Sequence, residues 1–389
     1  MTTRRLKIAI APDSFKGSMT ALEAAECIER GLRRALSNLS VRRIPMADGG
    51  DGTVQAIVDA TRGRLVRATV HDPLGRRIRA RFGLTGRGRR AVIEMAEASG
   101  LVLLEPSERN PMRTTTRGTG DLIRAAVGAG AKTILVGIGG SATNDGGTGM
   151  ARALGVRFLD ADGAEILEGG GGLRRLARID RSGILPALAG VRIEVACDVD
   201  NPLTGPHGAA RVYARQKGAS ADMIRTLESN MKHFARVVRR DLETDIDPVP
   251  GAGAAGGLGA GLMAFLGAEL RSGIDLVADA VRLRGRLAGC DLAITGEGRT
   301  DGQTVFGKAP MGVVRAARAL GIPVIVISGA TGDGAEALLH HGVEACFSAL
   351  SEPMDEEAIR RRGPGLLADC AEQVARVLAL DVGARRKRR

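Results

Sequence analysis

The sequence predicts an α/β protein of two domains, one inserted into the other. Apolar runs of strand length alternate with helical patterns near the N-terminus, and the same alternation returns near the C-terminus. Between them lies a stretch of alternating apolar and polar residues, which is typical of antiparallel strands. The 389 residues leave room for two domains. We therefore expect an outer domain of residues 1–62 and 285–380, an inserted domain of residues 63–284, and a basic tail of residues 381–389 without fixed structure.

The N-terminal elements predict a parallel sheet. The run LKIAIAP predicts a first strand, and residues 20–36 have helical spacing. Thr20 and Glu23 stand three residues apart at the start of this helix, as in a capping box. A second strand, VRRIPM, is followed by a helical pattern around TVQAIVDATRG. This βαβα order is the one that builds parallel sheets.

The middle of the chain begins with a predicted antiparallel meander over residues 64–95. Turn signals stand at DPLG, residues 72–75, and at GRG, residues 86–88. The α/β alternation returns at Gly118, and TILVGI predicts a buried strand. The Gly/Ala-rich run VPGAGAAGGLGAGLMAF leads into an apolar helical stretch, so we expect close helix packing or a backbone that lines a cleft.

Two late strands, in GCDLAITGEG and IPVIVISGAT, flank the helical run MGVVRAARALG. They resemble the opening βα units more than the middle of the chain. We therefore assign both ends of the chain to the same outer domain.

Composition excludes several classes of protein. No apolar run approaches eighteen residues, and the first apolar run is too short for a signal peptide, so neither a membrane span nor a secreted protein is expected. Five scattered cysteines show no C-x-x-C spacing, which indicates reduced thiols in a cytoplasmic protein and no zinc site. The net charge of +12 includes five positive charges from the final ARRKRR, and only 2% of residues are aromatic. Because few rings are available for base stacking, we expect no nucleic-acid partner.

Five polar, glycine-punctuated clusters follow strand-like runs. In open α/β sheets, ligands bind outside the carboxyl ends of the strands, so clusters in this position predict a binding site. The clusters are DSFKGS (13–18), ADGGDGT (47–53), GGSATNDGG (139–147), CDVDNPLTG (197–205) and TGEGRTDGQTVFGKAP (295–310).

The residue types in these clusters favour phosphoryl transfer. A nucleotide with Mg²⁺ needs one or two carboxylates, and a hydroxyl acceptor needs a base; aspartates or glutamates occur in all five clusters. Lys16 and Lys308 are two of only seven lysines. The run GQTVFGKA nearly fits a P-loop, but Ala309 replaces the hydroxyl residue and the run lies about a dozen residues beyond its strand, so a Walker fold is excluded. A serine nucleophile is also excluded, because no G-x-S-x-G elbow occurs.

Taken in order, the clusters resemble the bacterial glycerate kinases of type I, from about Lys7 to about Leu380. The matching blocks are APDSFKGSMTA, PMADGGDGT, GIGGSATNDGGTGM, CDVDNPLTG, QKGA, PGAGAAGGLGAGL and TGEGRTDGQTVFGKAP. The resemblance implies transfer of phosphate from ATP, with Mg²⁺, to D-glycerate, which gives 2-phosphoglycerate. It also implies a discontinuous flavodoxin-like domain, an inserted mixed-sheet α/β domain, and an active site in the cleft between them. Ala309 departs from the Thr that relatives usually have, and the basic tail lies outside the shared region.

Several alternatives stay open. Phosphate could go to the 3-hydroxyl of glycerate and give 3-phosphoglycerate, or to another small hydroxy acid. A non-catalytic regulator that senses sugar acids would keep the glycines but lose the carboxylates, and this chain keeps both. Either a monomer or a homodimer is compatible with the sequence.

The resemblance and the residue chemistry together predict individual roles. As catalytic residues we expect Lys16 and a base, with Asp198 favoured and Asp48 second. Substrate-binding residues are Ser14, Lys16, Ser141, Asn144 and Arg299, with Lys16 and Arg299 as the clamp for the carboxylate. Nucleotide-binding residues are Gly139, Gly140, Thr143, Gly296, Glu297, Gln303, Gly307 and Lys308, and metal ligands are Asp145, Asp198 and Asp301.

Overall fold

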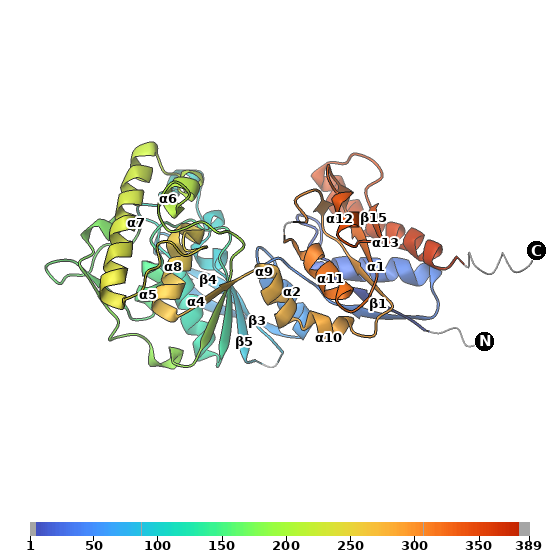
Figure 1. Ribbon diagram of the computed structural model, residues 1–389, viewed down its shortest axis with the longest axis horizontal. Coiled ribbons are helices and arrows are strands. Elements are labelled where there is room, and N and C mark those ends of the chain that lie inside the picture. Colours follow the sequence, from blue (N-terminus) through green and yellow to red (C-terminus); the bar gives the residue numbers. More distant parts are fainter. Residues whose placement is uncertain (1–4, 87, 306, 381–389) are drawn as a thin grey trace, which may run out of the picture. The chain divides into compact units, whose positions relative to one another are not determined.

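A computed structural model describes residues 5–86, 88–305 and 307–380. These residues form two compact units (Figure 1). Unit 1 contains the described residues up to Asp48, Gln55–Thr61, and those from Val277 onward. Unit 2 contains Gly49–Val54 and Arg62–Leu276. The predicted basic tail lies outside the described residues.

Unit 1 is built on a five-stranded sheet in which all neighbouring strands are parallel. Counted along the chain, the strands lie in the spatial order 2-1-3-4-5, the order of flavodoxin-like folds. This confirms the flavodoxin-like parallel sheet that was expected from the two ends of the chain. The strands are β1 (Leu6–Ile10), β2 (Leu39–Arg43), β11 (Leu292–Thr295), β13 (Val324–Ser328) and β15 (Ala345–Ser348), and β12 (Arg299–Thr300) pairs separately with β14 (Ala330–Thr331).

Helices cover this sheet and close its core. The Thr20 hydroxyl accepts a hydrogen bond from Glu23 N (3.2 Å) and Thr20 N donates to the Glu23 carboxylate (2.8 Å), so the predicted capping box is confirmed. The first and last helices pack so closely that a Cβ on Gly31 would lie 2.0 Å from Ala368 O. The helices are α1 (Ala21–Ala35), α10 (Leu283–Leu287), α11 (Ala309–Arg318), α12 (Ala337–His340) and α13 (Glu356–Leu378), while α2 (Thr53–Thr61) and α9 (Gly273–Ala280) contain residues of both units.

The second strand differs slightly from its prediction, which was residues 41–46. Strand β2 begins two residues earlier and ends at Arg43. Ile44 N and Met46 N still donate to Ile10 O and Pro12 O, so the chain keeps its course beside β1. Pro12, which follows β1, has no N–H to donate back to this segment, and the regular ladder therefore ends at Arg43.

Unit 2 is built on a six-stranded mixed sheet in the order β10-β9-β6-β5-β4-β3. The pairs β3–β4 and β4–β5 are antiparallel, and the remaining pairs are parallel, which confirms both the meander and the mixed sheet. At the predicted first turn, the Asp72 carboxylate accepts from Leu74 N and Arg76 N; the second turn signal includes residue 87, which is not described. The strands are β3 (Arg64–His71), β4 (Arg77–Leu84), β5 (Arg90–Glu94), β6 (Thr133–Gly137), β9 (Arg192–Ala196) and β10 (Glu269–Arg271), with a separate pair of β7 (Arg157–Leu159) and β8 (Arg178–Asp180).

The helices of unit 2 enclose a core that includes Phe82, Phe158, Phe234 and Phe265, all fully buried. They are α3 (Ala96–Ser99), α4 (Arg117–Gly128), α5 (Thr148–Ala153), α6 (Ala209–Tyr213), α7 (Ala221–Leu242) and α8 (Ala254–Leu266). Within the described part of the chain, no helix combines the length and apolar character needed to cross a membrane.

Candidate active site

Unit 1 contains a cavity of about 490 Å³ at the carboxyl ends of its parallel strands. In the order 2-1-3-4-5, the strand connections change direction between β1 and β11, and ligands of such sheets bind at this switch point. The two strand ends are adjacent there, since Asp13 N donates to Gly296 O (2.9 Å). Seven of the predicted site residues line this one cavity. They are Ser14, Lys16, Asp48, Glu297, Arg299, Asp301 and Lys308.

The DSFKGS cluster forms a tight turn that carries Lys16 at the cavity wall. Phe15 and Met19 pair across the turn, and Gly17 has a φ of +77°, which glycine adopts without strain. The Lys16 side chain is exposed, whereas Asp13 at the start of the turn is only 7% exposed. The turn therefore presents a mobile cation next to a buried carboxylate.

Asp13 is the most perturbed carboxylate of this cavity. Its burial, followed by the negative charges of Asp48 and Glu297, raises the pKa of Asp13 from 3.8 to about 7, although Ser14 N donates to its carboxylate (2.6 Å). In the sequence, Asp13 stands out only as the first residue of the DSFKGS cluster. Glu297 approaches it through the pairing of β1 with β11, two strands 284 residues apart in sequence, and that pairing is not readable from local patterns.

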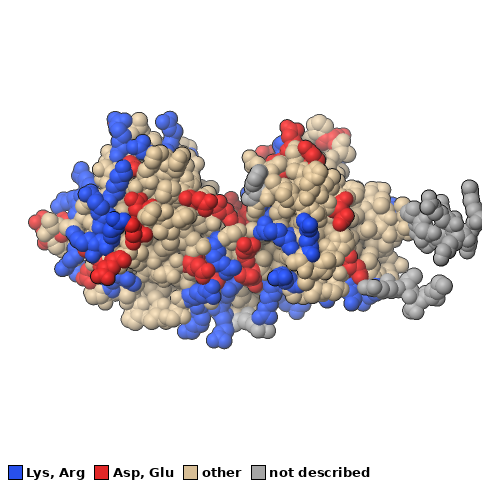
Figure 2. Space-filling view, viewed as in Figure 1, with Lys and Arg blue, Asp and Glu red and all other residues tan. Residues whose placement is uncertain are grey.

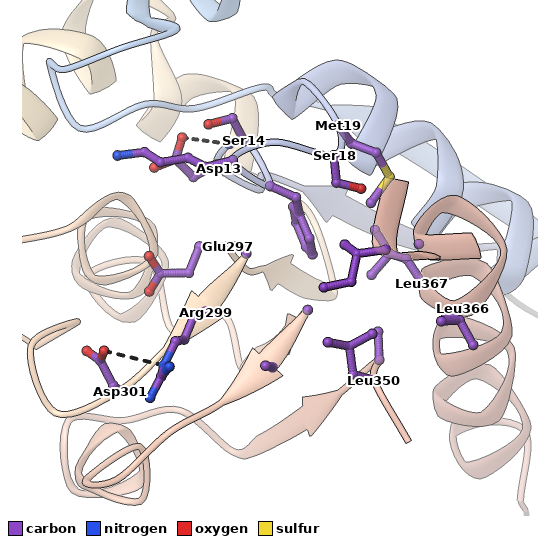
Figure 3. A pocket seen from close by; sticks show the side chains of 18 of the residues that line it. Asp13, Ser14, Ser18, Met19, Glu297, Arg299, Asp301, Leu350, Leu366 and Leu367 are labelled. Carbon is purple, nitrogen blue, oxygen red and sulfur yellow. Dashed lines mark hydrogen bonds and ion pairs between the residues drawn. The ribbon is translucent and has the colours of Figure 1, made fainter. Parts of the chain in front are cut away.

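Glu297 is held in place by its own segment. The hydroxyl of Thr304 donates to Glu297 Oε1 (2.6 Å), and burial raises the pKa of the Glu297 carboxyl. Lys308 Nζ lies 3.9 Å from Glu297 Oε2 and 3.6 Å from Asp301 Oδ1, and Arg299 Nε lies 4.0 Å from Asp301 Oδ2. Figure 3 shows Asp13, Glu297, Arg299 and Asp301 on the same side of the cavity.

The opposite side of the cavity is apolar. Met19, Leu350, Leu366 and Leu367 occupy it in Figure 3, and Ile359 also lines it. These side chains come from the end of β15, from α13 and from the turn before α1. The cavity thus has a charged end and an apolar end.

The other nucleotide-binding residues expected in this region, Gly296, Gly307 and Gln303, are not among the residues that line the cavity. A Cβ on Gly296 would lie 1.8 Å from Ile327 O, so close packing between strands explains that glycine. Gly307 has a φ of +101° with open space around its Cα, and Gln303 is exposed, with its backbone N–H donating to Asp301 Oδ1 (3.0 Å).

The remaining predicted residues belong to unit 2, where GGSATNDGG follows β6. Gly139 and Gly140 are exposed, and no atom lies within 4 Å of a Cβ built on Gly139. Asn144 is fully buried, yet neither its amide oxygen nor its amide nitrogen has a hydrogen-bond partner among the described residues. The same holds for the hydroxyl of Thr143. Unpaired buried polar groups are uncommon, so this loop retains hydrogen-bonding capacity.

The glycines of this loop also serve packing. A Cβ on Gly256 of the Gly/Ala-rich run would lie 2.0 Å from Thr143 O, and one on Gly261 would lie 2.5 Å from Gly146 O. Ala255, Gly256 and Gly257 all have positive φ, so this run is not regular helix at its start. The close packing expected of this run is what the structure contains.

The sequence predicts Asp145 as a metal ligand, but donors from the protein already occupy the hydrogen-bonding positions of its carboxylate. Thr116 N, the Thr116 hydroxyl, Gly147 N and Gly149 N donate to it at 2.8–3.2 Å. A carboxylate offers about four lone-pair directions, so these four donors leave little for a metal ion. The side chain is fully buried, and burial raises the pKa of Asp145. Its arrangement favours a structural role at the start of α5.

Lys217 is a residue that the sequence analysis missed. It is 1% exposed, and its Nζ donates to the Ser141 hydroxyl (2.6 Å) and to Thr143 O (2.7 Å). Burial lowers the pKa of Lys217 to about 7, against the opposing effect of the Asp145 charge. The one available signal was its place in the block QKGA, because no periodicity marks a lysine as buried.

Asp198, the favoured base, follows β9 in unit 2. It is exposed, and its Oδ1 accepts from Gly273 N (3.0 Å). Asp48, the second choice, is half-buried and lines the cavity of unit 1.

The carboxylates of unit 1 fit a Mg²⁺ ion with a nucleotide. No group of three or more His, Cys, Asp or Glu side chains is arranged as a metal site in the described ranges. Mg²⁺ is usually bound by only one or two carboxylates together with substrate phosphates, so such a group is not required. Burial, followed by the negative charges of Asp48 and Glu297, raises the pKa of Asp13, and a cation would offset this negative charge.

Comparison with known proteins shows the family of this chain. A model of the glycerate kinase family matches residues 8–379. The glycerate kinase of Bacillus subtilis strain 168 is 54% identical over 88% of this chain and 90% of its own length. The glycerate 2-kinase of Escherichia coli strain K12 is 50% identical over 89% of this chain and 91% of its own length. A crystal structure of a protein provisionally named glycerate kinase 2, from Salmonella typhimurium LT2, has a TM-score of 0.90 and 48% identity, and the match covers 96% of this chain and 98% of that one. The chain belongs to the glycerate kinase family.

Proposed function

We propose that this chain is a glycerate kinase that transfers phosphate from ATP to the 2-hydroxyl of D-glycerate and forms 2-phosphoglycerate. The observation that carries this proposal is the charged end of the cavity, where three cations and four carboxylates meet at the switch point of a flavodoxin-like sheet. The choice of the 2-hydroxyl is supported by the name of the Escherichia coli relative.

The cations divide into two roles. Lys16 and Arg299 clamp the carboxylate of glycerate, since both line the cavity with exposed and therefore adaptable side chains. Lys308 binds phosphate oxygens of ATP, because it follows Gly307 and precedes α11, whose N-terminus favours negative charge. Phosphoryl transfer depends mainly on positioning and on neutralising charge, so these side chains supply much of the catalysis.

Asp13 and Glu297 would hold Mg²⁺, because both are buried carboxylates with raised pKa values at the same end of the cavity. When bound, the ion supplies charge neutralisation for the transferred phosphate. Asp301 is the less suitable ligand of the original set, since it faces two cations, Lys308 and Arg299, whereas Glu297 faces Lys308.

The base that accepts the hydroxyl proton is Asp48 in this proposal, with Asp198 second. Asp48 lines the cavity that contains Lys16 and Arg299, and this reverses the order expected from the sequence. Substituting each by Asn discriminates between them, because Asn keeps the shape and loses the proton acceptor.

Solvated surface, rather than a nucleic-acid site, accounts for the basic side chains of α7. Figure 2 shows Lys and Arg on this helix interspersed with acidic side chains. The ion pairs there are Arg225–Asp222, Lys232–Glu228, Arg239–Asp245 and Arg240–Asp241. We also place the enzyme in the cytoplasm, since its five cysteines are free thiols.

The proposal is tested by ADP formation from ATP and Mg²⁺ with and without D-glycerate. We expect ADP release that depends on D-glycerate and exceeds that with other small hydroxy acids. Release that is absent with D-glycerate but present with another hydroxy acid would reassign the substrate, and none with any acid would leave a binding protein that senses sugar acids.

A further inference from the structure

The cavity of unit 1 also has an apolar part, opposite the charged residues, that the binding of glycerate does not use. We call the side chains of Met19, Leu350, Ile359, Leu366 and Leu367 the apolar end. D-Glycerate is a three-carbon acid with two hydroxyls, so apolar contacts of this extent do not serve it.

We propose that the apolar end binds the adenine and ribose of ATP, with the Ser18 hydroxyl as a hydrogen-bond partner of the nucleoside. This inference rests on the proposed kinase function. It adds to that function the place of the base, which none of the predicted site residues specifies.

The shape of the cavity supports a ligand with one anionic end and one apolar, flat end. The charged end lies at β1 and β11, and the apolar end lies at the end of β15, along α13 and in the turn before α1. The volume of about 490 Å³ falls within the range of small-molecule sites, which are mostly apolar with a few placed polar groups. A nucleotide whose phosphates contact Lys308 would extend its base away from the charged residues and toward α13.

Ser18 provides the second observation. Its hydroxyl oxygen is buried, lies at the cavity wall, and has no hydrogen-bond partner among the described residues. Buried hydroxyls normally have a partner, and rotation of the Ser18 side chain to another staggered rotamer exposes this one to a ligand atom in the cavity. Figure 3 shows Ser18 beside Met19, at the apolar end.

Gly363 of α13 packs closely against Ser18. A Cβ at this position would lie 2.9 Å from Ser18 Oγ and 3.9 Å from Met19 Cε. Any side chain here would therefore fill the region between α13 and the Ser18 hydroxyl.

Two variants of the full-length protein test the site. Ile359→Trp fills the apolar end from a half-buried position on α13, and Ser18→Ala removes only the unpaired hydroxyl. The matched control is Val377→Trp, which places the same ring at a β-branched residue of the same helix that is 60% exposed and does not line the cavity. Thermal unfolding of each variant verifies that it is folded.

The probes are ADP and inorganic triphosphate, each titrated calorimetrically with Mg²⁺ and without glycerate. We expect Ile359→Trp to weaken ADP binding at least ~10-fold, by excluding the base, and Ser18→Ala to weaken it roughly 3- to 10-fold, the range for one hydrogen bond. Neither variant should change the affinity for triphosphate, which has no base, and Val377→Trp should change neither affinity.

Wild-type affinity for ADP in both Ile359→Trp and Ser18→Ala would overturn the inference. So would equal loss of ADP and triphosphate binding in these variants, or a wild-type protein that binds triphosphate as tightly as ADP. Because the titrations need no turnover, they separate the two proposals. If the wild type releases ADP in the presence of glycerate but the variants bind ADP as tightly as the wild type, only the nucleoside site is refuted. If the variants lose ADP affinity selectively but the wild type shows no turnover with glycerate, only the proposed reaction is refuted.

Discussion

Replacing Asp13 with Asn should stabilise the protein at pH 8 and change its stability little at pH 4. The Asp13 carboxyl is buried near Asp48 and Glu297, and its pKa is raised from 3.8 to about 7. A carboxyl with a raised pKa favours folding below its unfolded pKa, and this contribution is lost as the pH rises through the folded pKa. One pKa unit corresponds to about 1.4 kcal/mol, so the ionised carboxylate reduces the free energy of unfolding by about 4 kcal/mol above pH 7. Asn is neutral and avoids that loss.

Urea unfolding at pH 4, 6 and 8, without divalent cations, measures the difference in the free energy of unfolding. The variant should gain progressively between pH 4 and pH 7 and then reach a plateau. Asp333→Asn is the control, since Asp333 is exposed in the same unit and should give the same small difference at every pH. An Asp13→Asn protein no more stable than wild type at pH 8, or equally stabilised at all three pH values, would refute this reasoning.

Urea unfolding with and without Mg²⁺ tests whether Asp13 belongs to the metal site, and it requires no measurement of activity. At pH 8, Mg²⁺ should stabilise the wild type more than Asp13→Asn, because a cation near Asp13 favours the charged carboxylate. Equal stabilisation of the two proteins would remove Asp13 from the metal site.

Three further predictions concern single side chains. Lys16→Ala should lower kcat/KM for D-glycerate at least ~100-fold, the loss typical of one electrostatic contact in the transition state. Its Tm should be unchanged because Lys16 is exposed, and near-normal kinetics would exclude Lys16 from the site. Asp48→Asn should reduce kcat ~10²- to 10⁴-fold with an intact fold, and a larger loss in Asp198→Asn would restore Asp198 as the base. Burial lowers the pKa of Lys217 to about 7 in the folded protein. Between pH 7 and pH 10 the unfolded chain therefore binds more protons than the folded protein, and the stability of the wild type should rise over this range. Lys217→Met should lack that rise in urea unfolding, and an equal rise in both proteins would contradict a buried, deprotonating lysine.

Local patterns in the sequence are enough to predict much of the fold. The periodicity of apolar residues predicts the parallel sheet of unit 1 and the meander β3–β5, because both depend on which faces are buried. The capping box of α1 is equally readable, since it involves residues three apart. The end of β2 differs from its prediction by three residues because Pro12 of the neighbouring segment removes a ladder donor without changing the course of the chain. The domain boundaries at residues 62/63 and 284/285 stay a prediction.

The candidate site is less accessible to such reasoning, because it depends on contacts between distant segments. The glycine-rich clusters mark the loops, but the excess charge around Asp13 arises only when β1 pairs with β11. Likewise, Asp145 is a good metal ligand by type, and only the fold brings the hydroxyl of Thr116 to its carboxylate. The burial of Lys217 depends on a loop 74 residues away, whose Thr143 carbonyl accepts a hydrogen bond from Lys217 Nζ.

The most direct test of the proposed reaction identifies the product formed from D-glycerate, ATP and Mg²⁺. Enolase is added, and phosphoenolpyruvate is followed by its absorbance, with and without phosphoglycerate mutase. Transfer to the 2-hydroxyl predicts a signal without mutase, because 2-phosphoglycerate is the substrate of enolase. A signal that requires mutase would contradict this and make the 3-hydroxyl the acceptor.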